Sequence, residues 1–252
     1  MTLDPVRFSR LKLIARSPLH YAAATVEETM AMEMGSAVHS LVLGGQTVLP
    51  WTKKSEAGNA CPRRGKDYDA FEAANPGALI LTEDAFNEAN AIAEAVKANP
   101  LAMSRLAGEH EAEYAWRFGA RDCAGRIDAL GDFLTELKVT ASADPQKVMW
   151  QALRMGWFAQ LAWYYDGLAQ RGIVVKELPR IVAVEPKRPY AVTVFRLPPH
   201  ALEMARRTYR GWFERLLVCE ATDEWPPYSQ SEVELDVPDN DVALNFGEDA
   251  AA

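Results

Sequence analysis

The stretch GRIDALGDFLTELKVT, residues 125–140, places ionisable side chains inside apolar sequence that is typical of two short strands. Asp128 lies in the first segment, and Glu136 and Lys138 lie two residues apart in the second. Side chains two residues apart on a strand project from the same face, so Glu136 and Lys138 are neighbours. Charged groups are costly to bury unless something pairs with them. These residues therefore either neutralise one another or hold an ion.

If the two segments pair through a turn near Gly131, Asp128 lies beside Glu136 at a similar depth. Two carboxylates that close repel each other, and a cation between them lets both stay ionised. Mg²⁺ suits this position, because it binds carboxylates together with waters and substrate phosphates. Lys138 would then orient a water molecule or balance charge on a phosphate. The alternative, which the spacing leaves open, is an exposed hairpin with a Glu–Lys pair and an unrelated aspartate.

Helix and strand patterns alternate along the rest of the chain. Thr82 and Asp144 are typical helix N-caps, Pro145 fits a first helical position, and Gly44 and Gly172 fit helix ends. This order predicts an α/β or mixed α+β fold, with a central mixed sheet flanked by helices. The expected helices cover residues 9–15, 33–44, 66–75, 82–99, 143–172 and 199–221, the expected strands cover 109–119, 123–131, 132–140, 180–186 and 190–198, and 45–67 is expected to be irregular.

Composition agrees with one large globular domain. The chain has 252 residues, of which 49% are hydrophobic and 25% charged. We expect a single domain over residues 1–230 and an acidic, partly flexible tail over 231–252. No apolar run is long enough to span a bilayer, and the N-terminus lacks a secretory signal, so no membrane association is expected. Cys61, Cys123 and Cys219 are odd in number and far apart, which favours a reducing cytoplasm.

The net charge of −8 argues against a protein that coats nucleic acid nonspecifically, because such proteins are normally basic. It does not exclude a local grip on DNA. The basic segments RFSRLK (residues 7–12) and PRRGK (62–66) are candidate phosphate contacts, since Arg and Lys make most contacts to the DNA backbone. No P-loop or helicase motif is present, which argues against an ATP-driven motor.

The order of these residues resembles a known nuclease signature. Asp128, ELK at 136–138 and a later helix containing QLAWY are similar to the PD-(D/E)XK nuclease superfamily, and within it to the RecB-type branch. GSAVH at 35–39 is similar to the histidine motif of that family. With RRGKDYDAF, LTEDAFNEANAIAEAV and EWPPY, the likeness to the C-terminal nuclease domain of RecE-type phage exonucleases extends over nearly the whole chain. It implies a restriction-endonuclease-like core.

The resemblance implies a role for each matching residue of the core motif. Asp128 and Glu136 would be metal ligands, and the backbone carbonyl of Leu137 would complete the shell. Lys138 would be the catalytic lysine. His39 would bind the metal or orient a ligand, whereas a lone histidine on an inner helix face is otherwise more often structural.

Further positions are less tightly specified. Family members carry a glutamate on the strand before the aspartate, and Glu111 or Glu113 fits, with Glu111 favoured. Gln160 and Tyr164 lie four residues apart on one helix face, and the resemblance places that face beside the active site, against the DNA backbone or the lysine. Arg126 precedes Asp128 and can contact a phosphate or form a structural ion pair.

The function implied is a Mg²⁺-dependent DNA exonuclease, with Mn²⁺ able to substitute. It would act 5′-to-3′ on double-stranded DNA ends and leave 3′ single strands for phage-type recombination. A single-strand annealing protein and further copies of the chain are the expected partners, in the cytoplasm of a bacterial, phage or prophage system. The four cysteines that hold an iron–sulfur cluster in some RecB-type nucleases are absent, so no cluster is expected.

Two other interpretations stay open. The first is an endonuclease or single-strand-specific nuclease in DNA repair or defence, because the motifs do not encode end specificity. The second is a non-catalytic DNA-binding module on the same fold. The retention of both acids and the lysine argues against the second.

Overall fold

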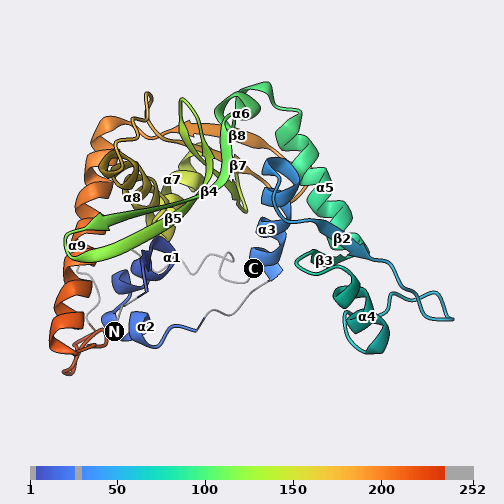
Figure 1. The fold of residues 1–252 in the computed structure, drawn as a ribbon, viewed down its shortest axis with the longest axis horizontal. Helices are drawn as coiled ribbons and strands as arrows, with labels where there is room; N and C mark the ends of the chain where they lie inside the picture. Colours follow the sequence, from blue (N-terminus) through green and yellow to red (C-terminus); the bar gives the residue numbers. More distant parts are fainter. Residues whose placement is uncertain (1–3, 26–29, 236–252) are drawn as a thin grey trace.

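A computed structural model describes residues 4–25 and 30–235 (Figure 1). Its six-stranded mixed sheet has the strand order β1-β5-β6-β7-β8, with β4 also paired to β5. The strands of this sheet are β1 (Val6–Arg7), β4 (Glu109–Phe118), β5 (Arg121–Leu130), β6 (Leu134–Val139), β7 (Arg180–Val184) and β8 (Val192–Arg196). The antiparallel meander of β4, β5 and β6 is confirmed, and β7 joins β6 in parallel.

Helices cover both faces of the sheet, as the sequence predicts. Their bounds are α1 (Phe8–Leu11), the 3₁₀ helix η1 (Lys12–Ala15), α2 (Pro18–Ala22), α3 (Met30–Leu43), α5 (Glu83–Lys97), α6 (Pro100–Arg105), α7 (Pro145–Met155), α8 (Trp157–Gln170) and α9 (Pro199–Thr222). Thr82 accepts from the amide of Ala85 and Asp144 from those of Gln146 and Lys147, which confirms both expected caps. The expected fold class is confirmed.

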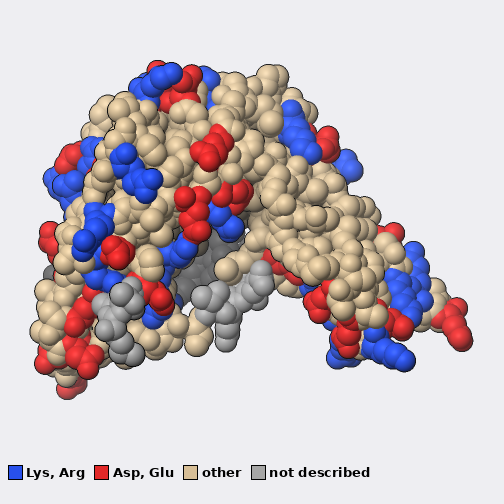
Figure 2. Space-filling model, viewed as in Figure 1, with Lys and Arg blue, Asp and Glu red and all other residues tan. Residues whose placement is uncertain are grey.

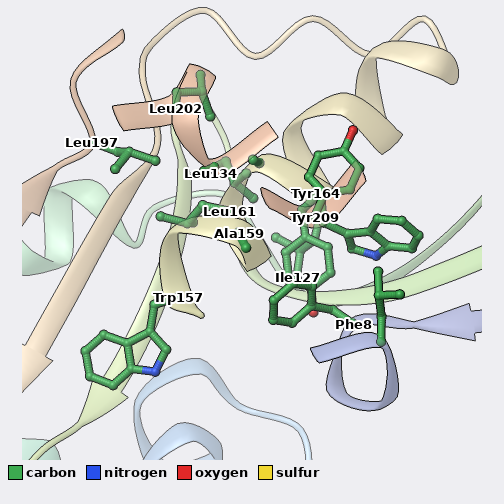
Figure 3. Close-up of a cluster of buried hydrophobic side chains, with 14 of the residues drawn as sticks. Phe8, Ile127, Leu134, Trp157, Ala159, Leu161, Tyr164, Leu197, Leu202 and Tyr209 are labelled. Atoms are coloured by element: carbon green, nitrogen blue, oxygen red, sulfur yellow. The ribbon is translucent and has the colours of Figure 1, made fainter. Parts of the chain in front are cut away.

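Two apolar clusters hold these layers together. One packs α1, α8 and α9 against the sheet, and Figure 3 shows part of it, including Ile127, Tyr164 and Tyr209. The other packs α3, α5 and α6 against the sheet through residues such as Leu137 and Val182. Each cluster covers a different helix layer, so the sheet between them is fixed from both sides and its polar residues need a local explanation.

The edge of β5 opposite β4 has a gap. It pairs with β1 at Cys123 and Ala124 and with β6 at Ala129 and Leu130, and neither neighbour pairs with the residues between. A strand edge without a partner leaves backbone groups and side chains open to a ligand. Asp128 lies in this gap.

Two expectations about local structure were wrong. The helix expected over 143–172 is divided at Gly156, whose φ of 74° is left-handed, into α7 and α8. The connection expected to be irregular contains β2 (Val48–Trp51), which pairs in parallel with β3 (Leu79–Thr82) in a second, two-stranded sheet. Strand β1 was not expected.

The β2–β3 sheet and α4 (Lys66–Ala74) form a lobe beside α5, away from the main sheet (Figure 1). Within it, Trp51 packs against the rings of Tyr68 and Phe71. In the parts of the chain that the structure describes, no helix is both long and apolar enough to cross a membrane. The tail expected over residues 231–252 lies outside the described residues from residue 236 onward.

Candidate active site

A cleft of about 770 Å³ opens at the gap in the β5 edge. Its walls come from α3, from α1 and η1, and from the start of α8, and its floor comes from β4, β5 and β6. The space-filling view shows acidic and basic side chains together along the wall of a hollow over β4 and β5 (Figure 2). The cleft therefore collects charge of both signs at the centre of the fold.

His39, Glu111 and Asp128 converge in this cleft from α3, β4 and β5. Their ligand atoms all lie within 4.8 Å of one another. Nδ1 of His39 is 3.6 Å from Oε1 of Glu111 and 3.5 Å from Oδ1 of Asp128. One imidazole nitrogen and two carboxylates at these separations form a donor set that a divalent cation can bind.

The second nitrogen of His39 fixes the ring. Nε2 donates to the backbone carbonyl of Leu137 at 2.8 Å, so Nδ1 is the nitrogen that faces the acids. A metal-binding histidine is typically oriented in this way by a backbone carbonyl. The carbonyl of Leu137 retains a second lone pair, and its expected role as a ligand stays a prediction.

Electrostatics couple these groups. Burial lowers the pKa of His39, but the charge of Asp128 and the hydrogen bonds that His39 donates to Asp128 and Glu111 outweigh it and raise the pKa to about 10. Burial raises the pKa of Asp128, but the charge and hydrogen bond of His39 hold it below its ordinary value. The protonated His39 thus supplies the positive charge between the two acids. A cation bound at Nδ1 would compete with that proton.

Glu111 lies in a strained backbone. Its φ is 53°, a left-handed value that non-glycine residues rarely adopt. His110 and Ala112 pair across the ladder with Ala129 and Ile127, yet Glu111 itself forms no such pair. A left-handed residue of this kind costs about 1–3 kcal/mol and persists where its surroundings impose it, often at functional sites.

The structure separates the two candidate glutamates. Glu111 faces His39, and its Oε2 also forms an ion pair with Nε of Arg126 at 3.1 Å. Glu113 instead pairs with Arg7 at the cleft wall. Of the two roles expected for Arg126, the structure shows an ion pair, with the arginine side chain 66% exposed and within reach of a ligand.

Glu136 and Lys138 lie beside this group on β6. Nζ of Lys138 donates to Oε2 of Glu136 at 2.7 Å, which confirms that the two side chains share a face. Burial and the charge of Asp128 raise the pKa of Glu136 to about 7, against the opposing effect of Lys138. Asp128 uses Oδ2 to accept from the backbone amide of Leu137 at 2.8 Å, which holds β6 to β5 at the gap.

One atom of this pair lacks a partner. Oε1 of Glu136 is buried and accepts no hydrogen bond from any residue that the structure describes. Buried carboxylate oxygens are nearly always paired, so an unpaired one requires an explanation. A divalent cation bound with the neighbouring Asp128 would satisfy it, and the residues present therefore fit such an ion.

Gln160 and Tyr164 line the same cleft from α8. Nε2 of Gln160 donates to the hydroxyl of Tyr164 at 3.2 Å. The Tyr164 ring also packs on Gly125, where an added Cβ would lie 2.3 Å from a ring carbon. Tyr164 is therefore both a core residue and a cleft residue, and Gly125 makes room for it.

The basic segments expected to contact phosphate differ in outcome. Lys12 lines the cleft, and burial, together with the charge of Lys138, lowers its pKa. The sequence indicates Lys12 only as one member of the basic segment 7–12. Its position in the cleft depends on the packing of η1, which the sequence does not show. In the other segment, Arg63 pairs with Glu33 and donates to the carbonyl of Ile80, which is a structural role.

Comparisons with known proteins agree with this architecture. The model of a family described as a PDDEXK-like domain of unknown function (DUF3799) matches residues 8–234. A crystal structure described as that of a "Putative exonuclease" from Eubacterium rectale is similar in fold, with a TM-score of 0.66 and 16% identity, over 97% of this chain and 94% of that chain. No curated protein matches the chain. The structural likeness extends to the whole fold, with its restriction-endonuclease-like core.

Proposed function

The chain belongs to the PDDEXK-like family described as DUF3799, within the PD-(D/E)XK nuclease superfamily, and we propose that it is a metal-dependent deoxyribonuclease. The observation that carries this proposal is the buried Glu136 oxygen without a partner, next to the cluster of His39, Glu111 and Asp128. Carboxylates that lie close together, with one oxygen lacking a hydrogen-bond partner, are expected at a site that binds a cation.

Each residue has a role in the proposed reaction. Asp128 and Glu136 would hold the metal, with His39 and Glu111 as further ligands. When bound, the ion would supply a water of lowered pKa and stabilise charge on the phosphodiester. Lys138, which donates to Glu136, would present its ammonium group to an attacking water or to a phosphate oxygen.

The cleft wall would position the DNA backbone. Gln160 can turn its amide toward a phosphate from the helix face it shares with Tyr164, and Arg126 is exposed enough to do the same. The charge distribution supports a DNA substrate despite the net charge of −8. All 27 Lys and Arg lie at or before Arg215, whereas ten of the 35 acids follow it.

We further propose that the substrate is an end of double-stranded DNA, degraded 5′-to-3′ with Mg²⁺, or with Mn²⁺ in its place. The remaining 3′ strand would pass to a single-strand annealing protein, in recombination of the phage type, and the enzyme would work as a homo-oligomer. These details rest on the resemblance to RecE-type nucleases, and the cleft geometry is compatible with them.

Timed digestion of linear duplex labelled at either the 5′ or the 3′ end tests this directly. We expect early loss of the 5′ label as mononucleotides or short fragments, only with a divalent cation, and no attack on closed circular duplex. Cleavage of closed circles would identify an endonuclease. Equal cleavage in EDTA would refute metal dependence.

A further inference from the structure

Helix α7 exposes an indole that the fold does not need. Trp150 is 67% exposed, which is unusual for the largest apolar side chain in a protein. Lys147 and Arg154 lie three residues before it and four residues after it, so all three project from one helix face. We call Lys147, Trp150 and Arg154 the α7 ridge.

The orientation of the ridge is fixed by the rest of the helix. Val148 and Ala152 are buried on the opposite face, and Gln151 accepts a hydrogen bond from the hydroxyl of Thr140. Asp144 caps the first turn. The helix therefore cannot roll to bury Trp150 without giving up these contacts.

The ridge carries unopposed positive charge. Helix α7 contains no Asp or Glu, and no ion pair of Lys147 or Arg154 is found among the residues that the structure describes. Both side chains are exposed. An aromatic ring between two free cations is suited to a ligand that alternates flat rings with anionic groups.

The helix that carries the ridge also reaches the active-site cleft. Met155 ends α7, and both Met155 and Trp157 line the cleft. Trp150 precedes Met155 by five residues, about 7.5 Å along the helix axis. Met155 projects about 140° around the helix from Trp150, so a strand that leaves the cleft crosses the C-terminal end of α7, past Arg154, to reach the indole.

We propose that the α7 ridge binds single-stranded DNA next to the active site. A base stacks on the indole of Trp150, and Lys147 and Arg154 contact the flanking phosphates. The exposed side chains of Met149 and Leu153 beside the indole extend the apolar surface for the base and sugar. The site deepens the proposed nuclease function, because a strand released or retained at a DNA end is single-stranded where it leaves the cleft.

Binding without cleavage tests the proposal. The probe is a fluorescein-labelled oligothymidylate of about 20 nucleotides, titrated in EDTA and followed by anisotropy. We expect Trp150→Ala to weaken binding about tenfold or more, and Trp150→Phe to restore part of it, because a stacked base contributes about 1–3 kcal/mol. Replacing both Lys147 and Arg154 with Ala should lower the slope of log K against log salt by about 1.4, from about 0.7 per lost phosphate contact.

Tyr228→Ala is the matched control. Tyr228 is also an exposed aromatic side chain, at 72%, but it lies in a segment without Lys or Arg after α9. Its loss should leave oligothymidylate binding unchanged. Binding to blunt duplex in EDTA should change less than twofold in Trp150→Ala, because stacking requires an unpaired base.

The outcomes separate the ridge from the nuclease proposal. Unchanged oligothymidylate affinity in Trp150→Ala overturns the ridge, even if the enzyme degrades DNA as proposed. A shift in the mass measured by light scattering in Trp150→Ala, with DNA affinity unchanged, also overturns it and identifies a protein interface instead. The expected loss of affinity in a chain that cleaves no DNA would support the ridge and refute the proposed function.

Discussion

Two carboxylates inside this molecule differ in whether their oxygens have hydrogen-bond partners. Asp166, between α8 and α9, accepts from Nε of Arg206 at 2.8 Å, from the hydroxyl of Tyr209 at 2.7 Å and from Arg210 at 3.3 Å. Glu136, on β6 near Asp128, has one oxygen that accepts from Lys138 and one without any partner among the described residues. Side chains of the protein satisfy both oxygens of Asp166, whereas they satisfy only one oxygen of Glu136.

The difference indicates what each site is for. A network whose members are all satisfied stabilises the packing of two helices. A buried acid left unsatisfied, beside the strained backbone of Glu111 and the crowded acids of the cleft, costs stability in the free chain. Such a loss of stability is expected where the binding of a ligand offsets it. Mutations should therefore act on stability at Asp166 and on chemistry at the cleft.

The largest expected effect is that of Asp128→Asn. The amide keeps an acceptor for the backbone amide of Leu137 but removes the charge that attracts a cation. We expect cleavage of linear duplex to fall about a thousandfold, since a bound metal supplies several kcal/mol of transition-state stabilisation, and calorimetry should show weakened Mn²⁺ binding. The variant should still unfold cooperatively in urea with EDTA, at a lower urea concentration because His39 loses its charged partner. Full activity in this variant would show that Asp128 is not a metal ligand needed for cleavage.

Lys138→Ala should follow in size. Loss of the ammonium group removes a charge that would stabilise the reacting phosphate, and we expect a fall in kcat of about a hundredfold. Metal binding should persist, because the ligand carboxylates remain. The comparison of kcat with Mn²⁺ affinity in the same preparation checks this. Equal losses of both would assign Lys138 to holding the site together instead.

How far the sequence predicted the molecule depends on how local each feature is. The meander and the Thr82 cap follow from residues close in the sequence, and so does the pairing of Glu136 with Lys138, because a period of two decides which side chains share a face. Gly156 was overlooked because the sequence on both sides of it is helical, and periodicity does not report a change of axis.

Features that depend on distant contacts were missed or left open. Strands β1 and β2 are short and exist through pairing with β5 and β3. Glu111 was favoured over Glu113, but alternation places both on one face and does not decide between them. The left-handed backbone at Glu111 and the pairing of Glu113 with Arg7 distinguish them, and both are tertiary properties.

Asp166→Ala tests the network of Asp166, Arg206 and Tyr209, in which every oxygen of the carboxylate has a partner. The change removes the acceptor that Arg206 and Tyr209 share, although Arg206 keeps its ion pair with Glu203. We expect a loss of about 2 kcal/mol in the free energy of unfolding, since the exposed part of the network can turn to water. Urea unfolding measures it. Activity per folded molecule should be unchanged at a temperature where the variant is folded. A large fall in kcat with intact stability would show that this network reaches the active site.

The smallest expected effect has the opposite sign and tests the cost of the cleft directly. Asn tolerates a left-handed φ better than Glu does, and Glu111→Asn also removes one negative charge beside Asp128. We expect the metal-free chain to gain about 1 kcal/mol in the free energy of unfolding, while Mn²⁺ binding weakens. The ion pair with the exposed Arg126 contributes little. The contact of Glu111 with His39, at 3.6 Å, is lost as well and reduces the gain.

Glu113→Asn is the matched control for that gain. It removes the same charge from the same strand, two residues away, at a position whose backbone is not left-handed. Urea unfolding of both variants in EDTA separates backbone strain from charge. A gain in Glu111→Asn alone attributes the cost to the strained backbone at the site. Equal gains in both would attribute it to the negative charge of the cleft wall, and no gain in either would contradict the view that this cleft is held at the expense of stability.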